Sequence, residues 1–217
     1  MKNKHRYLKV LAAFLTIALF LGCFAATASA APANITQAAN MTQAQRNFIA
    51  RVGAMASEDM KKTGVLASLT IAQAILESGW GTSALAKNAN ALFGIKADSR
   101  WNGRVYSKST LECYDGVNFT RETALFRAYD SWQHSVNDHS AFLLAGSRYA
   151  AVIGERNYRR ACVAIHRAGY ATDPGYAQKL ITLIEKYNLM AYDGTGQGML
   201  PRVLTVLQDA SKLCKLK

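Results

Sequence analysis

The stretch QAILESGWG, Gln73 to Gly81, places a single carboxylate, Glu77, behind an apolar run and just ahead of a Gly-Trp-Gly corner. An acid near the C-terminal end of a helix and against apolar neighbours is disfavoured in its charged form, because the helix dipole and burial both oppose the negative charge. Such an acid keeps its proton nearer to neutral pH and can donate it to a leaving oxygen. Glu77 is therefore a candidate general acid. The alternative is a solvated glutamate, or one bonded to nearby backbone.

The elements that must position this acid are helices. Apolar residues at helical spacing predict a first helix over residues 42–64 and a second over 65–78, which carries Glu77. Gly64 and Gly79 stand just past their ends, where a left-handed residue commonly terminates a helix. Ser83 can cap a short third helix over residues 84–89.

A β-hairpin is predicted between Gly94 and Tyr129, where Thr, Val, Tyr and Phe become frequent. Asp115-Gly116 lies between two alternating runs and is typical of a two-residue hairpin turn. Such a turn pairs Glu112 with Phe119. It also places Glu112 and Tyr114 on one face of the hairpin and Cys113 on the other.

Helices resume after the hairpin. Ser131 is a predicted N-cap, a further helix ends before Gly169, and Asp173 and Pro174 are predicted as the N-cap and first residue of a last helix. The sequence thus predicts an α+β, mainly α fold, in which a small β-hairpin lobe splits a helical domain. A cleft is expected between the lobes, with Glu77 at a helix end that can face it.

Several longer stretches resemble a known family: AQAILESGWGTSALAKNANALFGIKA, TLECYDG, FRAYDSW, DHSAFL and HRAGYATDPGYAQKLITLIEKYNL. Together they closely resemble glycoside hydrolase family 73, the endo-β-N-acetylglucosaminidases that cut bacterial peptidoglycan and include flagellar wall hydrolases. The resemblance covers about Met41 to Tyr192. It implies a lysozyme-like helical domain whose small β-hairpin lobe flanks a groove for a glycan strand.

The resemblance also implies roles for two acids. Glu77 matches the general acid, and Glu112 matches a second acid in a T-x-E-aromatic stretch, although Cys113 stands where the family usually has Tyr. Glu122, in TRETALF, is a competitor for the second role. Glycoside cleavage suits two carboxylates, because one protonates the leaving oxygen while the other activates water or stabilises the developing cation. Whether the mechanism is retaining, inverting or assisted by the substrate's acetamido group stays open.

Further site residues follow from the same resemblance. Tyr170, in GYATDP, is expected to face the catalytic acid and to orient the sugar or the water, unless it is only a core tyrosine. The expected substrate-binding residues are Asn90, Phe93, Trp101 and Tyr176. For Phe93 packing is an alternative role, and Trp80 and Trp132 are expected in the core.

The N-terminal residues read as an export signal. Basic residues precede an apolar run that ends in Ala-Ser-Ala, which predicts a signal peptide over residues 1–30, cut after Ala30. An uncleaved anchor and lipoprotein processing at Cys23 are the alternatives. We expect a linker over 31–40, a glucosaminidase domain over 41–193 and a tail of unknown role over 194–217. The protein should be secreted, to the cell wall or periplasm, and meet the membrane only through its signal peptide.

The net charge and the spacing of certain side chains limit which partners and ligands we expect. Without the signal the chain carries 22 basic and 14 acidic residues, about +8 net, so an anionic cell wall is a favoured partner. No nucleic-acid-binding motif is present. His134, His139 and His166 lack metal-ligand spacing, so neither a metal nor a cofactor is expected. The pairing of the remaining cysteines stays open, and we expect a monomer. These cysteines are Cys113, Cys162 and Cys214.

The function predicted from the sequence is an exported peptidoglycan hydrolase. It would cleave the N-acetylglucosaminyl-β-1,4-N-acetylmuramic acid bond of glycan strands. One alternative is a lytic transglycosylase or muramidase of the same fold. The other is a wall-binding protein that kept the groove but lost the chemistry.

Overall fold

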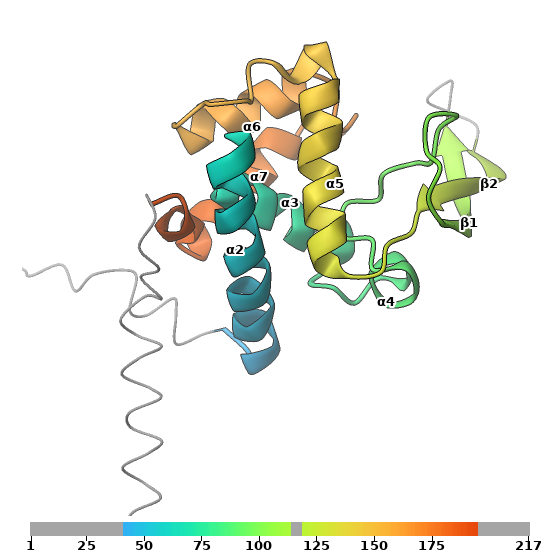
Figure 1. Cartoon of the computed structure of the whole chain (residues 1–217), viewed down its shortest axis with the longest axis horizontal. Coiled ribbons are helices and arrows are strands. Elements are labelled where there is room, and N and C mark those ends of the chain that lie inside the picture. Colours follow the sequence, from blue (N-terminus) through green and yellow to red (C-terminus); the bar gives the residue numbers. More distant parts are fainter. Residues whose placement is uncertain (1–40, 114–118, 195–217) are drawn as a thin grey trace, which may run out of the picture. The chain divides into compact units, whose positions relative to one another are not determined.

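The computed structural model describes residues 41–113 and 119–194, which form helices and one two-stranded antiparallel sheet (Figure 1). The predicted α+β, mainly α class is confirmed. The helices are α2 (Gln43–Thr63), α3 (Ala67–Ser78), α4 (Ala84–Ala89), α5 (Trp132–Ala145), α6 (Tyr158–Arg167) and α7 (Tyr176–Lys186). Two short 3-10 helices, η1 (Ser147–Tyr149) and η2 (Leu189–Tyr192), and strands β1 (Val105–Cys113) and β2 (Phe119–Arg127) complete the fold.

Some predictions fall outside the described residues. They are the signal peptide, the linker, the tail beyond residue 194 and the Asp115-Gly116 turn. Within the part of the chain that is described, no helix is both long and apolar enough to cross a membrane. Cys162 is a free thiol, completely buried, and burial raises its pKa to about 12.

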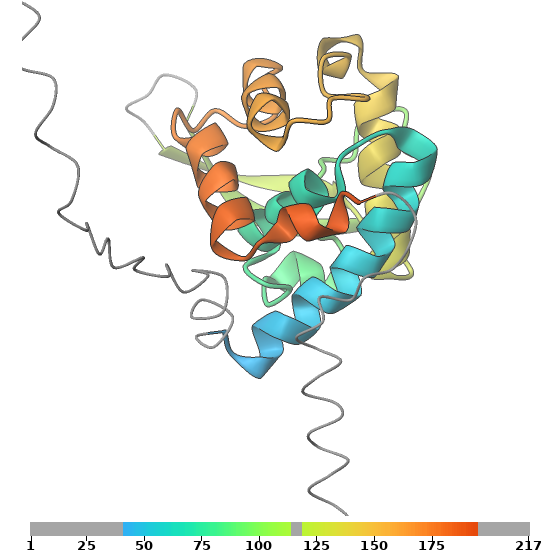
Figure 2. The same ribbon diagram turned by 90° about the vertical axis from the view of Figure 1, so that its left-hand side faces the viewer.

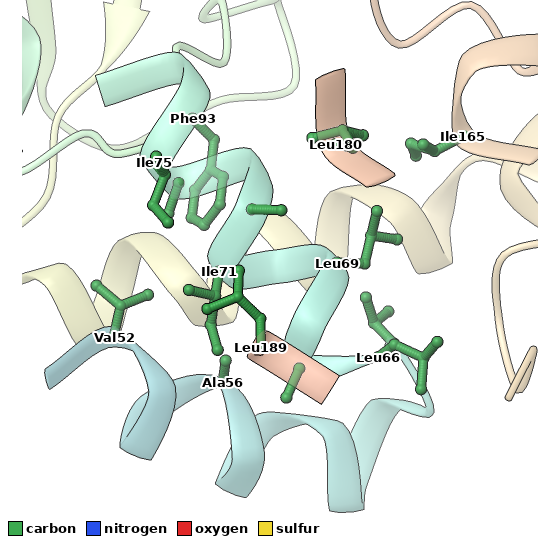
Figure 3. Packing of buried hydrophobic residues seen from close by; sticks show 14 of the residues in the cluster. Val52, Ala56, Leu66, Leu69, Ile71, Ile75, Phe93, Ile165, Leu180 and Leu189 are labelled. Atoms are coloured by element: carbon green, nitrogen blue, oxygen red, sulfur yellow. The ribbon is translucent and has the colours of Figure 1, made fainter. Parts of the chain in front are cut away.

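Helix α3 lies at the centre of the core. It is buried on almost every side and packs against α2, α6, α7 and η2. Figure 3 shows its Leu69 and Ile71 among side chains of α2, α7 and η2. Burial on all sides holds this helix firmly, and the helix carries Glu77 at its C-terminal end.

The two ends of α3 are held in different ways. Leu66 offers no side-chain cap at the N-terminus, and instead the Ser68 amide donates to Asp193 Oδ1 over 2.7 Å. Figure 2 shows the orange-red segment η2, which precedes Asp193, passing close to α2 and α3. A Cβ at Gly53 of α2 would collide with the Tyr192 ring, so the close approach of η2 requires glycine there.

Most helix ends follow the predicted local signals. Ser83 and Ser131 accept hydrogen bonds from the backbone amides three residues later, and Gly64 ends α2 at φ 74°. The start of α7 differs from the prediction, because its N-cap is Gly175 and its first residue Tyr176. Asp173 accepts from the Gly175 amide at 2.8 Å and so closes a turn ahead of the helix.

The hairpin register also differs from the prediction. Glu112 pairs with Thr120, and Cys113 pairs with Phe119. Five residues, 114–118, separate these last partners, and a two-residue turn at Asp115-Gly116 would have required a different pairing. The predicted pairing of Glu112 with Phe119 is therefore wrong by one residue.

The corrected register changes which positions share a face. Thr110 pairs with Glu122, so positions 112 and 122 lie on the same face of the hairpin. Nearer the base, Tyr106 and Phe126 belong to that face, and Phe126 packs with α4 and the loop after it. Val105 and Leu125, on the other face, are about half exposed, at 50% and 48%. Both acidic positions therefore share the face that is directed toward α4 at the base of the hairpin.

Candidate active site

The corner after α3 fixes where Glu77 stands. Gly79, Trp80 and Gly81 all have positive φ, at 56°, 63° and 74°. A Cβ at Gly81 would collide with the Trp132 ring, so this position requires glycine for space as well as for conformation. Trp80 packs edge-on between Phe48 and Tyr187, which agrees with its expected place at the core. The corner therefore ends α3 abruptly, with Glu77 in its last turn.

A chain of hydrogen bonds orients the Glu77 carboxylate. The Tyr176 hydroxyl donates to Glu77 Oε1 over 2.8 Å. The same hydroxyl accepts from Gln73 Nε2 over 3.0 Å, and Gln73 is completely buried one turn before Glu77 on α3. Because Tyr176 belongs to α7, two helices together hold the acid in one orientation.

The surroundings of Glu77 raise its pKa. Burial against neighbouring protein atoms is the main cause, and the hydrogen bond from Tyr176 lowers the pKa in partial compensation. The side chain as a whole is nonetheless exposed to solvent, which limits the shift and lets a substrate reach the acid. Glu77 is thus suited to hold a proton at a higher pH than an ordinary glutamate does.

Tyr170 lies close to the same acid. Its ring stacks on the Tyr176 ring, with centroids 6.0 Å apart and an interplanar angle of 22°. Its hydroxyl is buried and has no hydrogen-bond partner among the described residues. Burial raises the pKa of this hydroxyl well above its usual range, and the nearby Tyr176 and Glu77 add to the rise. The hydroxyl therefore stays neutral, and its expected contact with a sugar or a water stays a prediction.

Comparisons with known proteins decide what this arrangement belongs to. The profile of a family described as "Glucosaminidase: Mannosyl-glycoprotein endo-beta-N-acetylglucosaminidase" matches residues 53–189. The chain belongs to the glucosaminidase family. The predicted resemblance to family 73, its lysozyme-like fold and its glycoside hydrolase class are confirmed.

Two relatives of this glucosaminidase are named an exo-glucosaminidase and a peptidoglycan hydrolase. The exo-glucosaminidase LytG of Bacillus subtilis is 37% identical over 198 residues, which are 88% of this chain and 69% of LytG. The peptidoglycan hydrolase FlgJ of Vibrio cholerae is 40% identical over 73% of this chain. The chain spans only 50% of the length of this FlgJ.

A solved structure supports the same fold. The catalytic domain of the autolysin Auto from Listeria monocytogenes has a TM-score of 0.63 and 34% identity with this chain. The match covers 70% of this chain and 89% of that domain. The glucosaminidase fold described above is therefore that of a catalytic domain in a related protein.

The four expected substrate-binding residues lie in different surroundings. Phe93 and Tyr176 are buried, each 3% exposed; Phe93 stacks on His139 at 4.0 Å, and Tyr176 holds Glu77. Neither offers a ring face to a sugar, so their expected role in stacking does not fit this glucosaminidase. Asn90 and Trp101 keep partial exposure and stay predictions. Asn90 Nδ2 donates to the Tyr129 carbonyl over 3.1 Å, while Trp101 lies under Arg127, 4.8 Å from ring centroid to guanidinium.

The two candidates for a second acid, Glu112 and Glu122, are placed only by the hairpin backbone. Positions 112 and 122 share a face, whereas the predicted register put them on opposite faces. The corrected register therefore favours neither Glu112 nor Glu122, and the family motif remains the reason for preferring Glu112.

An ion-pair network at the base of the hairpin was missed by the sequence analysis. Arg127 is 9% exposed and donates from Nη1 to both carboxylate oxygens of Asp138, each over 3.1 Å. The Tyr129 hydroxyl donates to Asp138 Oδ2 over 2.7 Å. This network ties the end of β2 to α5. An arginine and a tyrosine in FRAYDSW, close to the end of an apolar strand, were the available signal.

His139 is a second residue that the sequence analysis undervalued. In the sequence analysis it served only to exclude a metal site, but it is completely buried, and neither ring nitrogen has a partner within the described part of the chain. Burial lowers its pKa to about 3. In the sequence, His139 shares one helical stripe with Val136 and Leu143, which indicates that its side chain points into the core. All three residues are buried on α5.

Proposed function

We propose that this protein is an exported peptidoglycan hydrolase that cleaves the N-acetylglucosaminyl-β-1,4-N-acetylmuramic acid bond. The observation that supports this most directly is the Glu77 carboxyl. Its pKa is raised because protein atoms around it displace water, it is held by Tyr176, and its side chain remains exposed to solvent. A proton donor at a leaving oxygen needs these three properties together.

The reaction assigns each group a step. Glu77 gives its proton to the glycosidic oxygen as the bond to the anomeric carbon breaks. Glu112, the preferred second acid, stabilises the developing positive charge or takes a proton from the attacking water. The hydroxyl of that water joins the anomeric carbon. The Tyr170 hydroxyl is available to orient the reacting sugar or the water.

Location and partners follow from the same proposal. The predicted signal peptide would export the protein from the cytoplasm to the cell wall. The domain itself would work as a monomer. A net charge of about +8 would add attraction to an anionic wall, screened over roughly 8 Å at physiological ionic strength. Hydrolysis of this kind requires water and no cofactor.

The decisive experiment identifies the new sugar end. Purified peptidoglycan is digested, the ends are reduced with borohydride, and the sugar alcohols are identified by mass spectrometry. N-acetylglucosaminitol supports the proposal. N-acetylmuramitol would instead indicate a muramidase, and 1,6-anhydro ends a lytic transglycosylase. Binding without any new ends would indicate a wall-binding protein.

The same digest tests whether cleavage occurs within the strand. LytG is named an exo-glucosaminidase, so release from strand ends is a second candidate. Internal cleavage produces fragments of many lengths early in the reaction, whereas terminal cleavage releases small units while long strands persist. The Glu77→Gln protein is the control, and we expect its rate to fall by roughly 10²- to 10⁴-fold, as on losing general acid catalysis.

A further inference from the structure

One hollow of the molecule has none of the residues around Glu77 in its lining. It is a depression of about 620 Å³ between the η1 region and one side of α6. Four arginines and a glutamate share its lining with small apolar side chains. The lining residues are Arg148, Ala151, Glu155, Arg159, Arg160, Val163, Ala164, Arg167 and Ala168.

The positive charge of this arginine-lined depression is only partly neutralised. Arg160 donates to both carboxylate oxygens of Glu155, each over 2.9 Å, and Arg159 pairs with Glu185. Arg148 and Arg167 have no acidic partner in the described part of the chain. Two exposed guanidinium groups are therefore left to meet an incoming anion.

We propose that the arginine-lined depression binds a carboxylate-bearing peptide, namely the peptide attached to the glycan strand. A guanidinium presents parallel N–H groups that match a carboxylate. The lining between the arginines comes from Ala151, Val163, Ala164 and Ala168, whose surface suits small apolar side chains. A phosphate-linked polymer would use the charges but leave this apolar surface unused. The chemistry therefore favours an acidic peptide.

A series of aromatic contacts links the arginine-lined depression to the neighbourhood of Glu77. The Arg148 guanidinium lies 4.7 Å over the Tyr149 ring, and that ring is 6.3 Å from the Tyr170 ring. Tyr170 in turn stacks on Tyr176, which bonds Glu77. The inference rests on the proposed function, because it takes the peptide from the strand in the groove.

The test compares two substrates in the inactive Glu77→Gln background, so that binding is measured without cleavage. One is peptidoglycan strands with their peptides, and the other is the same strands after an amidase has removed the peptides. The variant Arg148→Gln/Arg167→Gln removes the two unpaired charges of the depression. The variant Arg51→Gln/Lys62→Gln removes two exposed charges of α2 and is the matched control; Arg51, like Arg148, stacks on an aromatic ring.

We expect the parent protein to bind the peptide-bearing strands more tightly, by about tenfold, as two exposed charge-assisted contacts allow. In Arg148→Gln/Arg167→Gln that ratio should fall toward one, while the control variant keeps it. An equal loss by both variants on both substrates would overturn the inference in favour of unspecific attraction. A ratio of one in the parent protein would also overturn it.

Two further outcomes separate the possible failures. If removal of phosphate-linked polymers from the wall abolishes the arginine effect while the peptides remain, the depression binds those polymers and the inference is wrong. If the wild-type protein releases no new sugar ends but the ratio persists, the proposed hydrolysis fails and the peptide site stands. Circular dichroism of each variant checks that the fold is unchanged.

Discussion

Two tyrosines that stack on each other have opposite hydrogen-bonding states. The Tyr176 hydroxyl is fully engaged, since it accepts from Gln73 and donates to Glu77. The Tyr170 hydroxyl is equally enclosed but has no partner within the described residues. The first therefore positions the carboxyl of Glu77, whereas contact of the second with substrate or water stays a prediction.

Replacing Tyr176 by Phe should shift the pH profile of the reaction. The hydrogen bond from Tyr176 favours the charged form of Glu77, so its loss raises the pKa of that carboxyl further. The reactive form of Glu77 is the protonated one, and the alkaline limb of kcat/KM should therefore move to higher pH. We also expect kcat to fall several-fold, because the carboxyl is oriented less well.

The pH profile is measured on soluble glycan fragments, with Tyr187→Phe as the matched control. Tyr187 packs edge-on against Trp80 on the other side of the corner. An alkaline limb that stays in place in Tyr176→Phe would show that this hydrogen bond does not set the pKa of Glu77.

Tyr170→Phe should separate stability from activity. A buried hydroxyl without a partner costs free energy, so its removal should leave the free energy of unfolding unchanged or raise it by up to about 1 kcal/mol. The rate should fall roughly tenfold or more, since losing a charge-stabilising or orienting donor commonly costs that much. Urea denaturation and the release of reducing ends measure the two effects. Lower stability with normal turnover would make Tyr170 a core residue only.

At the scale of elements, the hairpin is held by one end. Arg127 and Tyr129 both contact Asp138 of α5, and Phe126 packs near α4. The register then carries both acidic positions outward along one face. Positions 112 and 122 are diagonal neighbours, about 7–8 Å apart in such a ladder.

This diagonal arrangement yields distinct expectations for the two acids. Glu112→Gln should lower turnover by up to about 10²- to 10⁴-fold if it alone activates water, and by less if the substrate's acetamido group shares the task. Glu122→Gln should keep near-normal turnover. It should also move the acid limb of the profile to lower pH, because removing a neighbouring negative charge eases ionisation of Glu112.

Parallel pH profiles of Glu112→Gln and Glu122→Gln on one substrate measure both effects. Equal inactivation of Glu122→Gln and Glu77→Gln would show that Glu122 is the second acid. An unshifted acid limb would show that the two carboxyl groups do not interact.

The elements that the sequence predicted well are those with local signals. Helix caps at Ser83 and Ser131 depend on residues three positions apart, and they are confirmed. The predicted hairpin register and the predicted start of α7 were wrong. The observed register depends on a five-residue connection, and the observed helix start depends on a turn closed by Asp173. In the site, the hydrogen bond of Tyr176 to Glu77 joins residues 99 apart, which only tertiary packing brings together.

At the scale of the whole molecule, a histidine lies in the core beneath the site. The His139 ring stacks on Phe93 and meets the Tyr170 ring edge-on, 5.9 Å away. Its pKa of about 3 means that it stays neutral in the folded state at any ordinary pH. In the unfolded chain a histidine titrates near 6.5.

The free energy of unfolding should therefore depend on pH through His139. Between the two pKa values the unfolded state binds one proton more than the folded state, so stability falls as pH drops from about 6.5 toward 3. The slope is at most about 1.4 kcal/mol per pH unit. His139→Leu should be about as stable as the wild type at pH 7 and more stable at pH 4.5.

Urea denaturation at pH 7, 5.5 and 4.5 measures this difference. Asp59 and Asp193 have raised pKa values through burial, which stabilises the folded state as pH falls, but they act alike in both proteins. The difference between the proteins therefore isolates His139. A difference that does not change with pH would contradict the buried, neutral histidine.

The contact between Ser68 and Asp193 also bears on the order in which the chain matures. It spans 125 positions, nearly the whole domain, and Leu189 of the core arrives only four residues before Asp193. A chain that leaves the ribosome or a translocation channel from its N-terminus exposes α3 long before its cap exists. The helix that carries Glu77 thus completes its contacts last, so the domain should remain unfolded and threadable until its final turn has emerged.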